Sequence, residues 1–420
     1  MALLVPMPLR IPRRVPLPRS LPLAAIEAQW RARSSLAELG YDPPMLASRR
    51  RLFARLVLGG FSLALSLLAA ELAVRLARPQ EAMTVSRGLY VADPPRRYRL
   101  AAGHHGRVAN HVEFDHEVLV DDHGLRGRSP AADGGPGRAA TLRVLALGDS
   151  FTFGIGASES ETYPARLETR LRAAGVAAEV LNAGAPGYGV PDEVGWYEAW
   201  GVPLRPDVVV IAPFLANDLQ DAEPGSVVRV VDGELVVGNQ RGGPRRWLYY
   251  HSHLFRLLKS SLFEGALRER LGLAEPWARR QRRAELALYE PTLPADLAAG
   301  ASATEVAIAR LARLAAEQHA RVIAVLVPSL PQVDPRQWVA LHRELGVDAK
   351  GHDPRRPNHL FAAMFERHGI AVVDPTEALA AAVARGETVY YPRDQHLTPA
   401  GYDLLAREVA LATMRELRPR

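Results

Sequence analysis

The stretch Val144–Gly154, VLALGDSFTFG, decides the fold class of this chain. Its first four residues are apolar or small, and such a run is typical of a buried strand. Gly148 ends the strand, and Ser150 follows on the turn. Open α/β sheets place their chemistry in the crevice beyond the carboxyl ends of their strands. Ser150 is therefore a candidate nucleophile, and the alternative is a turn serine that caps a helix.

Strands and helices alternate from residue 141 onward, which indicates an α/β fold with a central parallel sheet and helices on both sides. The run Val208–Ile211 is apolar throughout and predicts a strand that is buried on both faces. We expect strands over 143–147, 179–182, 207–214, 322–327 and 370–373, and helices over 163–174, 192–200, 304–319 and 399–416.

Residues 222–300 interrupt this alternation. The stretch 227–237 is expected to form a hairpin that turns at Asp232-Gly233. The later stretch 247–273 mixes aromatic, leucine and arginine residues. Two interpretations stay open: the block is an insertion over the mouth of the site, or it is a peripheral decoration that does not touch substrate.

The sequence before residue 141 divides by composition into three segments. Residues 1–48 are rich in proline and arginine, so we expect disorder there. Met45 is an alternative start, in which case the residues before it are not translated. Residues 49–78 carry a membrane signal, and residues 79–140 form a connecting region with short strands, one of them over 116–120.

Residues 49–78 predict a single transmembrane anchor. Leu56–Ala70 is uncharged and rich in leucine, and several arginines precede it. Glu71 and Arg75 follow at the helical i,i+4 spacing and can pair near the interface. Arginine on the N-terminal side predicts that this end stays in the cytoplasm and that the later residues lie outside. A cleaved signal peptide and the core helix of a soluble protein are the alternatives.

Composition excludes several classes of function. The formal net charge is +6, but much of the excess lies in local arginine clusters with no nucleic-acid recognition motif, so we expect no nucleic-acid partner. The chain has no cysteine, which excludes thiol catalysis, cysteine zinc sites and disulfides. Its histidine pairs are not accompanied by the other residues that usually complete a metal site, so we expect no metal and no cofactor.

Four short segments carry residues that are suited to chemistry. Three of them follow the carboxyl ends of strands and therefore face one crevice, while the fourth precedes the last helix. They are GDS at 148–150, NAGAPGYG at 182–189, LAND at 215–218 and RDQHL at 393–397.

Ser150, His396 and Asp394 supply a nucleophile, a general base and a group that orients the base. A serine hydroxyl is too weakly acidic to attack an ester unaided, whereas an imidazole can take its proton and later pass it to the leaving alcohol. Asp394 and His396 are two residues apart. On an extended segment this spacing puts both side chains on one side, so that the carboxylate holds the ring.

The attacked carbonyl develops negative charge and needs hydrogen-bond donors in an oxyanion hole. The candidate donors are the backbone N–H groups of Ser150 and Gly187 and the side-chain amide of Asn217. Asp149 and Asp218 are expected to brace their loops by hydrogen bonds. The alternatives are structural: a turn glycine, an asparagine that ends a strand, and a surface histidine at position 396.

These residues resemble the SGNH/GDSL hydrolase superfamily, whose four name-giving residues fall in order on Ser150, Gly187, Asn217 and His396. The resemblance covers roughly residues 140–416. It implies a flavodoxin-like three-layer α/β/α fold over 141–420 and ester hydrolysis through a covalent acyl-enzyme. The layout also resembles membrane-anchored bacterial members with one N-terminal helix and an extracytoplasmic domain.

The chain departs from the pattern of the superfamily at four positions. Phe151 stands where many members have leucine, and Leu215 stands where glycine is usual, which could narrow the pocket or shift the Asn217 amide. In the last segment, Arg393 and Leu397 occupy positions that are commonly aspartate and proline. Asp394 resembles the variant of the O-acetyltransferase-like branch.

The sequence thus predicts a membrane-anchored serine esterase that acts on O-acyl esters of a small molecule or glycan, on a cell-envelope or extracytoplasmic substrate. An O-acyltransferase with the same triad is one alternative, because only the acceptor of the acyl group differs. A catalytically silent envelope glycan-binding module is another alternative.

Overall fold

The computed structural model describes residues 44–80, 82–94, 96–110, 112–127, 141–222, 228–231, 233–237, 244–259 and 277–418. The expected disorder up to residue 43, the turn residue Asp232 and much of the stretch 247–273 lie outside these ranges. Residues 44–48 were also expected to be disordered but belong to a helix, which Pro44 can begin because its fixed φ suits a first helical position.

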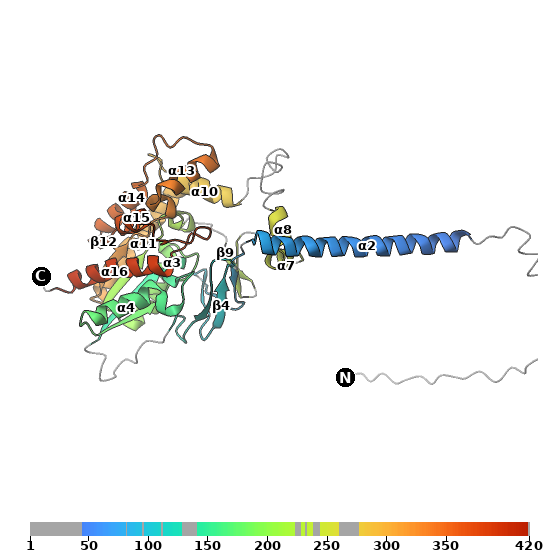
Figure 1. Ribbon diagram of the computed structural model, residues 1–420. Helices are drawn as coiled ribbons and strands as arrows, with labels where there is room; N and C mark the ends of the chain where they lie inside the picture. The colour runs from blue at the N-terminus through green and yellow to red at the C-terminus, as the bar shows by residue number, and fades with distance from the viewer. Residues whose placement is uncertain are drawn as a thin grey trace, which may run out of the picture. The chain divides into compact units, whose positions relative to one another are not determined.

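The course of the chain is shown in Figure 1. The strands are β1 (Thr84–Val85), β2 (Tyr90–Ala92), β3 (Tyr98–Leu100), β4 (His105–Ala109), β5 (Asp115–Leu119), β6 (Leu142–Gly148), β7 (Ala178–Asn182), β8 (Val208–Ala212), β9 (Val228–Val231), β10 (Glu234–Val237), β11 (Arg321–Val325) and β12 (Ala371–Val373). The helices are α2 (Pro44–Ala77), α3 (Ser150–Phe153), α4 (Tyr163–Ala173), α5 (Val190–Trp196), α6 (Asp218–Asp221), α7 (Pro244–His251), α8 (His253–Leu258), α10 (Trp277–Ala287), α11 (Ala295–Glu317), α12 (Leu330–Val333), α13 (Pro335–Leu345), α14 (Arg356–Glu366), α15 (Thr376–Ala384) and α16 (Pro399–Glu416).

Five parallel strands form the central sheet in the order β12-β11-β8-β6-β7. Read from the other edge this is the 2-1-3-4-5 order of flavodoxin-like folds. The central strand β8 is completely buried along its length, as its apolar run predicts. The expected α/β class and the parallel sheet are therefore confirmed.

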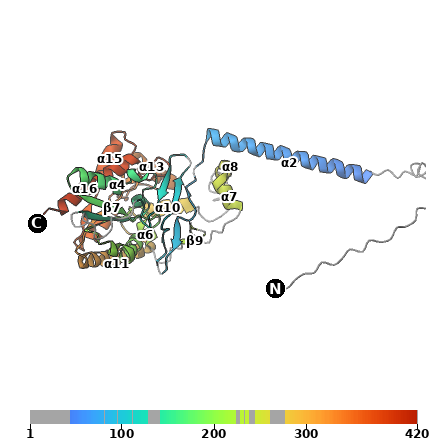
Figure 2. The same cartoon turned by 90° about the horizontal axis from the view of Figure 1, so that it is seen from below.

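Alternate residues along the strands of the sheet pack into two separate hydrophobic cores. Leu145 and Ile211 face the core that is covered by α5, α11 and α14, whereas Val144 and Val210 face the core that is covered by α4, α15 and α16. Figure 2 shows α4 and α16 on one side of the sheet and α11 on the other. This is a three-layer α/β/α arrangement, and it places the carboxyl ends of β6 and β8 at one edge.

Two helices differ most from their expected bounds, whereas strands β8 and β11 each end only two residues before the expected position. Helix α11 begins at Ala295, inside the block 222–300 and well before the expected start at residue 304. The expected helix over 192–200 is split, because α5 ends at Trp196 and continues as a π turn over Tyr197–Gly201.

The segment before the sheet forms small antiparallel sheets. Strands β1, β4 and β5 form one sheet, in which β4 and β5 are joined by a tight hairpin. Strands β2 and β3 form a second sheet, which receives the β9–β10 hairpin because the Gly233 carbonyl accepts the N–H groups of Gly88 and Tyr90.

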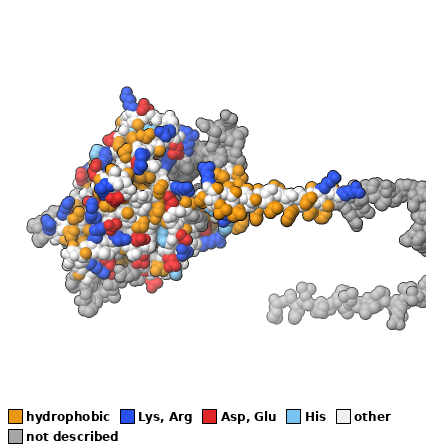
Figure 3. Space-filling view, in the orientation of Figure 1, with side chains coloured by type: hydrophobic (Ala, Val, Ile, Leu, Met, Phe, Trp, Pro, Cys, Tyr) orange, Lys and Arg blue, Asp and Glu red, His pale blue; other side chains and the backbone are white. Residues whose placement is uncertain are grey.

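Helix α2 has the composition of a membrane-spanning segment. Its part Arg51–Ala77 has 27 residues, and the most apolar window within it has a mean hydropathy of 2.0 and is not buried. Figure 3 shows apolar side chains along the length of this helix. The helix is long and apolar enough to cross a membrane, and a signal sequence has the same properties.

Candidate active site

Ser150 lies just beyond the end of strand β6, beside the central strand β8, and begins the short helix α3. Asp149 caps this helix, because its carboxylate accepts the backbone N–H of Phe151 at 2.9 Å. Gly154 ends the helix in the left-handed conformation and donates its N–H to the Ser150 carbonyl. The serine is thus fixed in a tight strand-to-helix turn.

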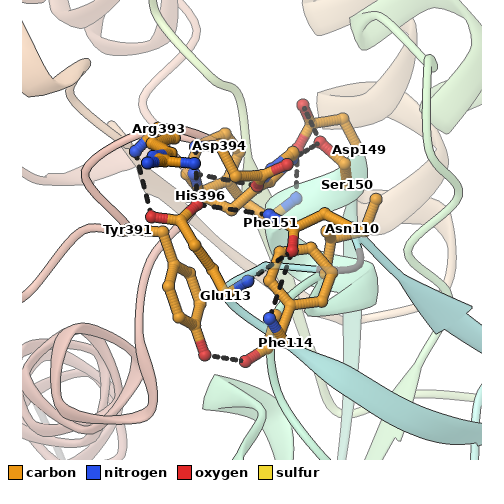
Figure 4. Close-up of polar contacts among 12 residues, drawn as sticks. Asn110, Glu113, Phe114, Asp149, Ser150, Phe151, Tyr391, Arg393, Asp394 and His396 are labelled. Atoms are coloured by element: carbon orange, nitrogen blue, oxygen red, sulfur yellow. Dashed lines mark hydrogen bonds and ion pairs between the residues drawn. The ribbon is translucent and has the colours of Figure 1, made fainter. Parts of the chain in front are cut away.

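His396 and Asp394 reach Ser150 from the loop before α16, as Figure 4 shows. The Ser150 Oγ atom lies 2.8 Å from His396 Nε2. On the far side of the ring, His396 Nδ1 lies 2.5 Å from Asp394 Oδ1. All three side chains therefore form one hydrogen-bonded chain across 246 residues of sequence.

The backbone between Asp394 and His396 is not extended, so the expected reason for their approach is wrong. Gln395 lies in the left-handed region with φ at 68°, and its N–H donates to the Tyr391 carbonyl at 3.0 Å. The Asp394 carboxylate then also accepts the His396 N–H at 3.4 Å. A turn, and not an extended strand, brings the Asp394 carboxylate to the Nδ1 atom of the His396 ring.

Phe151 supports the histidine ring. Its ring lies 4.8 Å from the His396 ring and 4.2 Å from the Phe214 ring, which stands at the end of the neighbouring strand. The contact between Phe151 and Phe214 is stacked and that between Phe151 and His396 is tilted, and together they restrict the rotation of the imidazole. The phenylalanine in place of leucine is therefore a packing residue of the site.

Asn217 follows β8 and faces the same space as Ser150. Its Nδ2 donates to the carboxyl group of Asp221, one helical turn later, at 2.9 Å. The i,i+4 spacing of these residues in the sequence is the signal that could have revealed Asp221. Leu215 does not narrow the site, because it is completely buried in the core.

Gly187 has the backbone conformation that favours glycine, with φ at 81°. A Cβ atom there would lie 2.9 Å from the hydroxyl oxygen of Tyr98, and the Gly187 carbonyl accepts a hydrogen bond from Arg97. Gly187 is not among the described residues that line the pocket at Ser150.

Several buried carboxyl groups lie behind the site. Burial raises the pKa of Asp149 to about 6 and that of Asp221 to about 7. Burial also raises the pKa values of Asp218 and Glu193 well above their usual range, and nearby carboxyl groups add to the effect. Asp149 accepts the backbone N–H of Phe151, whereas neither carboxyl oxygen of Asp218 has a hydrogen-bond partner among the described residues.

A pocket of about 340 Å³ opens beside Ser150. Its wall includes side chains of α10, which belongs to the block 222–300, so this block contributes to the site. The described lining residues are Ser150, Phe151, Phe214, Ala216, Asn217, Gln220, Gln281, Arg282, Glu285, Ser329, Leu330, Arg393, Asp394, Gln395 and His396. Among the residues that the structure describes, no group of three or more histidine, aspartate or glutamate side chains is placed to hold a metal ion.

Comparison with known families decides the class of this site. The model of the GDSL-like lipase/acylhydrolase family matches residues 146–404. The chain belongs to this family. This GDSL-like hydrolase is therefore an enzyme that hydrolyses esters, and the matched region contains Ser150, Asn217, Asp394 and His396.

Solved structures of low sequence identity are also similar to this GDSL-like hydrolase. A lipase/acylhydrolase from Enterococcus faecalis is 16% identical, with 66% of this chain and 98% of that chain covered and a TM-score of 0.35. A catalytic mutant of Axe2, an acetylxylan esterase from Geobacillus stearothermophilus, is 15% identical, with 66% and 97% covered and a TM-score of 0.36. The esterase EstA from Pseudoalteromonas sp. is 11% identical, with 66% and 98% covered and a TM-score of 0.35. A search of curated proteins finds no match to the chain.

Proposed function

We propose that Ser150 is the nucleophile, His396 the general base and Asp394 the group that orients the imidazole. The observation that carries this proposal is the continuous chain from Ser150 Oγ to His396 Nε2 at 2.8 Å and from His396 Nδ1 to Asp394 Oδ1 at 2.5 Å. The Nδ1–H group donates a hydrogen bond to the Asp394 carboxylate and keeps its proton. The Nε2 lone pair is therefore free to accept the serine proton.

The reaction then proceeds in two halves. Ser150 Oγ attacks the acyl carbon as its proton passes to His396 Nε2, and the tetrahedral intermediate expels the alcohol, which takes that proton. The product is an acyl-enzyme on Ser150. Water attacks this ester by the same route with His396 again as base, and the carboxylic acid leaves with the serine restored.

We assign the oxyanion hole to the backbone N–H groups of Ser150 and Gly187 and the side-chain amide of Asn217. Asn217 supports this role because it lines the pocket beside Ser150, and its hydrogen bond to Asp221 limits its rotation. One such donor contributes roughly 10²–10³ to turnover.

The pocket favours short acyl esters of polar alcohols. Gln220, Gln281 and Gln395 supply amide groups to its wall, and Arg282 and Glu285 supply an ion pair with a distance of 3.1 Å. A volume of about 340 Å³ lies at the small end for ligand sites. We therefore propose an acylated glycan or small polar ester as substrate, with α2 as a membrane anchor and the site on the extracytoplasmic side.

The test is Ser150→Ala in the full chain, purified in detergent. We expect turnover of 4-nitrophenyl acetate to fall by about 10³-fold or more, and labelling by a fluorophosphonate probe to disappear. Ser302→Ala, at an exposed position of α11, is the matched control and should keep both properties. Full activity of Ser150→Ala would contradict the proposal.

A further inference from the structure

The hairpin between β4 and β5 reaches the loop that carries the catalytic acid. The tip of this hairpin is Asn110–Phe114, and it lies about 280 residues before that loop in the sequence. Glu113 Oε1 accepts the backbone N–H of Arg393 at 3.1 Å, and Glu113 Oε2 accepts the backbone N–H of Asp394 at 2.9 Å. Figure 4 shows the carboxylate pointing at these two groups.

The two contacts act on the part of the loop that needs support. Residues 392–394 form a turn, residues 392–395 are not part of a helix or strand, and Gln395 has a left-handed backbone. A carboxylate that accepts two consecutive N–H groups makes charge-assisted hydrogen bonds, which are stronger than neutral ones. The backbone of Asp394 is thereby held while its side chain holds His396.

Glu113 is itself fixed before it makes these contacts. The side-chain oxygen of the buried Asn110 accepts the N–H groups of Val112, Glu113 and Phe114, at 3.0, 2.6 and 3.2 Å. The Asn110 amide also donates to Glu113 Oε2 at 3.2 Å. These hydrogen bonds already fix the Glu113 carboxylate. Its contacts with the loop therefore cost little additional conformational entropy.

A second contact joins the hairpin tip to the nucleophile side of the site. The Phe114 ring lies 5.2 Å from the Tyr391 ring, and the Tyr391 hydroxyl donates to the Gly156 carbonyl at 2.7 Å. A Cβ atom at Gly156 would lie 2.5 Å from Cε2 of Tyr391, so only glycine permits this approach. Tyr391 therefore lies between the hairpin tip and the loop that follows Ser150, and it connects the two.

We propose that Glu113 is a positioning residue for ester hydrolysis, which sets the Asp394 carboxylate against His396 through the loop backbone. The matched family region begins at residue 146, so this residue belongs to the N-terminal β segment and lies outside that region. The inference rests on the proposed roles of Ser150, His396 and Asp394. With Glu113 in this role, the β4–β5 hairpin contributes to catalysis by positioning the loop that carries Asp394.

The test compares Glu113→Gln and Glu113→Ala with wild type, all as full chains in detergent. Glutamine keeps the length and one acceptor oxygen but turns an NH₂ group toward the second backbone N–H, so we expect kcat to fall about 10-fold. Alanine removes both acceptors, so we expect a fall of about 100-fold. KM for 4-nitrophenyl acetate should change less than about 3-fold, because the pocket itself is untouched.

The rates are measured per active site, counted by fluorophosphonate labelling, so that loss of folded protein does not count as loss of turnover. Glu117→Gln is the matched control on β5, because its side chain is 65% exposed and pairs with Arg107. It should keep the wild-type kcat. If Glu113→Ala does not fold, Glu113→Gln decides by itself.

Three outcomes are distinguishable. A graded loss of kcat per labelled site, with KM kept, supports the inference. Wild-type kcat per site in folded Glu113→Gln, or a loss equal to that of Glu117→Gln, overturns it while the proposed function stands. Failure of the wild type to react with the probe overturns both.

Discussion

At the scale of single residues, the burial of Asp221 links the candidate active site to the pH dependence of folding stability. Its carboxyl group accepts a hydrogen bond from the Asn217 amide, and the partial burial of this half-buried residue favours the neutral form. Neighbouring carboxyl groups act in the same direction, since Asp149 and Asp192 raise its pKa, while Arg97 lowers it. A neutral acid can donate or accept a hydrogen bond, which suits a residue that orients an amide.

A pH dependence follows from this shift. Folding raises the pKa of Asp221 from 3.8 to about 7, so the folded state holds this proton more tightly than the unfolded state. Its contribution to stability is complete below about pH 4 and is lost as pH rises through about 7. The full effect is at most about 4 kcal/mol.

We expect Asp221→Asn to flatten the fall in Tm between pH 5 and pH 8 relative to wild type, because asparagine does not ionise. Thermal unfolding at several pH values measures this difference. Asp115→Asn, at an exposed position, should leave the wild-type slope unchanged. Equal slopes for wild type and Asp221→Asn would show that this carboxyl is ionised in the fold.

At the scale of elements, the contact between α11 and α6 fixes the loop that carries Asn217. Gly300 lies against the backbone of α6, where a Cβ atom would come within 1.9 Å of the Leu219 carbonyl oxygen. That oxygen belongs to backbone and cannot rotate away as a side chain can. The close approach of the two helices therefore requires glycine at this position of α11.

Gly300→Ala tests this contact. Alanine favours a helix over glycine by about 1 kcal/mol, but overpacking a core costs about 1–3 kcal/mol. The difference is a net loss of up to about 2 kcal/mol in the free energy of unfolding, and we expect lower kcat as well because α6 must move. Urea unfolding measures the first effect.

The control for this substitution is Val306→Ala, at a position of α11 whose residue is 70% exposed. It should change the free energy of unfolding by less than about 0.5 kcal/mol. A Gly300→Ala protein as stable and as active as wild type would mean that α11 and α6 lie further apart than described.

At the scale of the whole molecule, α2 has the length and composition of a membrane anchor or of a signal sequence. An exposed, largely apolar helical segment of 27 residues is costly in water, and a bilayer removes that cost. The alternative of a buried core helix disagrees with the exposure of its leucines. An anchor helix stays in the mature protein, whereas a cleaved signal is removed from it.

Membrane fractionation tests the anchor. We expect the full chain to stay in the membrane pellet after alkaline carbonate, and Leu63→Arg with Leu67→Arg to move it to the supernatant. Each central arginine costs about 2.5–3.5 kcal/mol on insertion. Alanine at the same two positions is the control and should keep the chain in the membrane.

Two further results complete this experiment. Protease added outside intact cells should cut the hydrolase part if it is extracytoplasmic. A soluble wild-type protein whose N-terminus begins after α2 would instead establish a cleaved signal and rule out the anchor.

The sequence by itself determined the elements that depend on local pattern. Apolar runs predicted β6 and β8, because a strand that is buried on both faces needs an unbroken series of such residues. Strand ends then placed Ser150 and Asn217 at one edge of the sheet. The closing helix was predicted over 399–416, as observed, since its N-cap Thr398 and following proline are local signals.

Only the tertiary structure decided how distant segments meet. The turn at Gln395, the carboxylate of Glu113 and the wall supplied by α10 join parts of the chain that are far apart, and no periodicity records such contacts. Their geometry depends on loop dihedral angles and on packing between layers. These are set by the folded chain as a whole, because each loop takes the conformation that its distant partners stabilise.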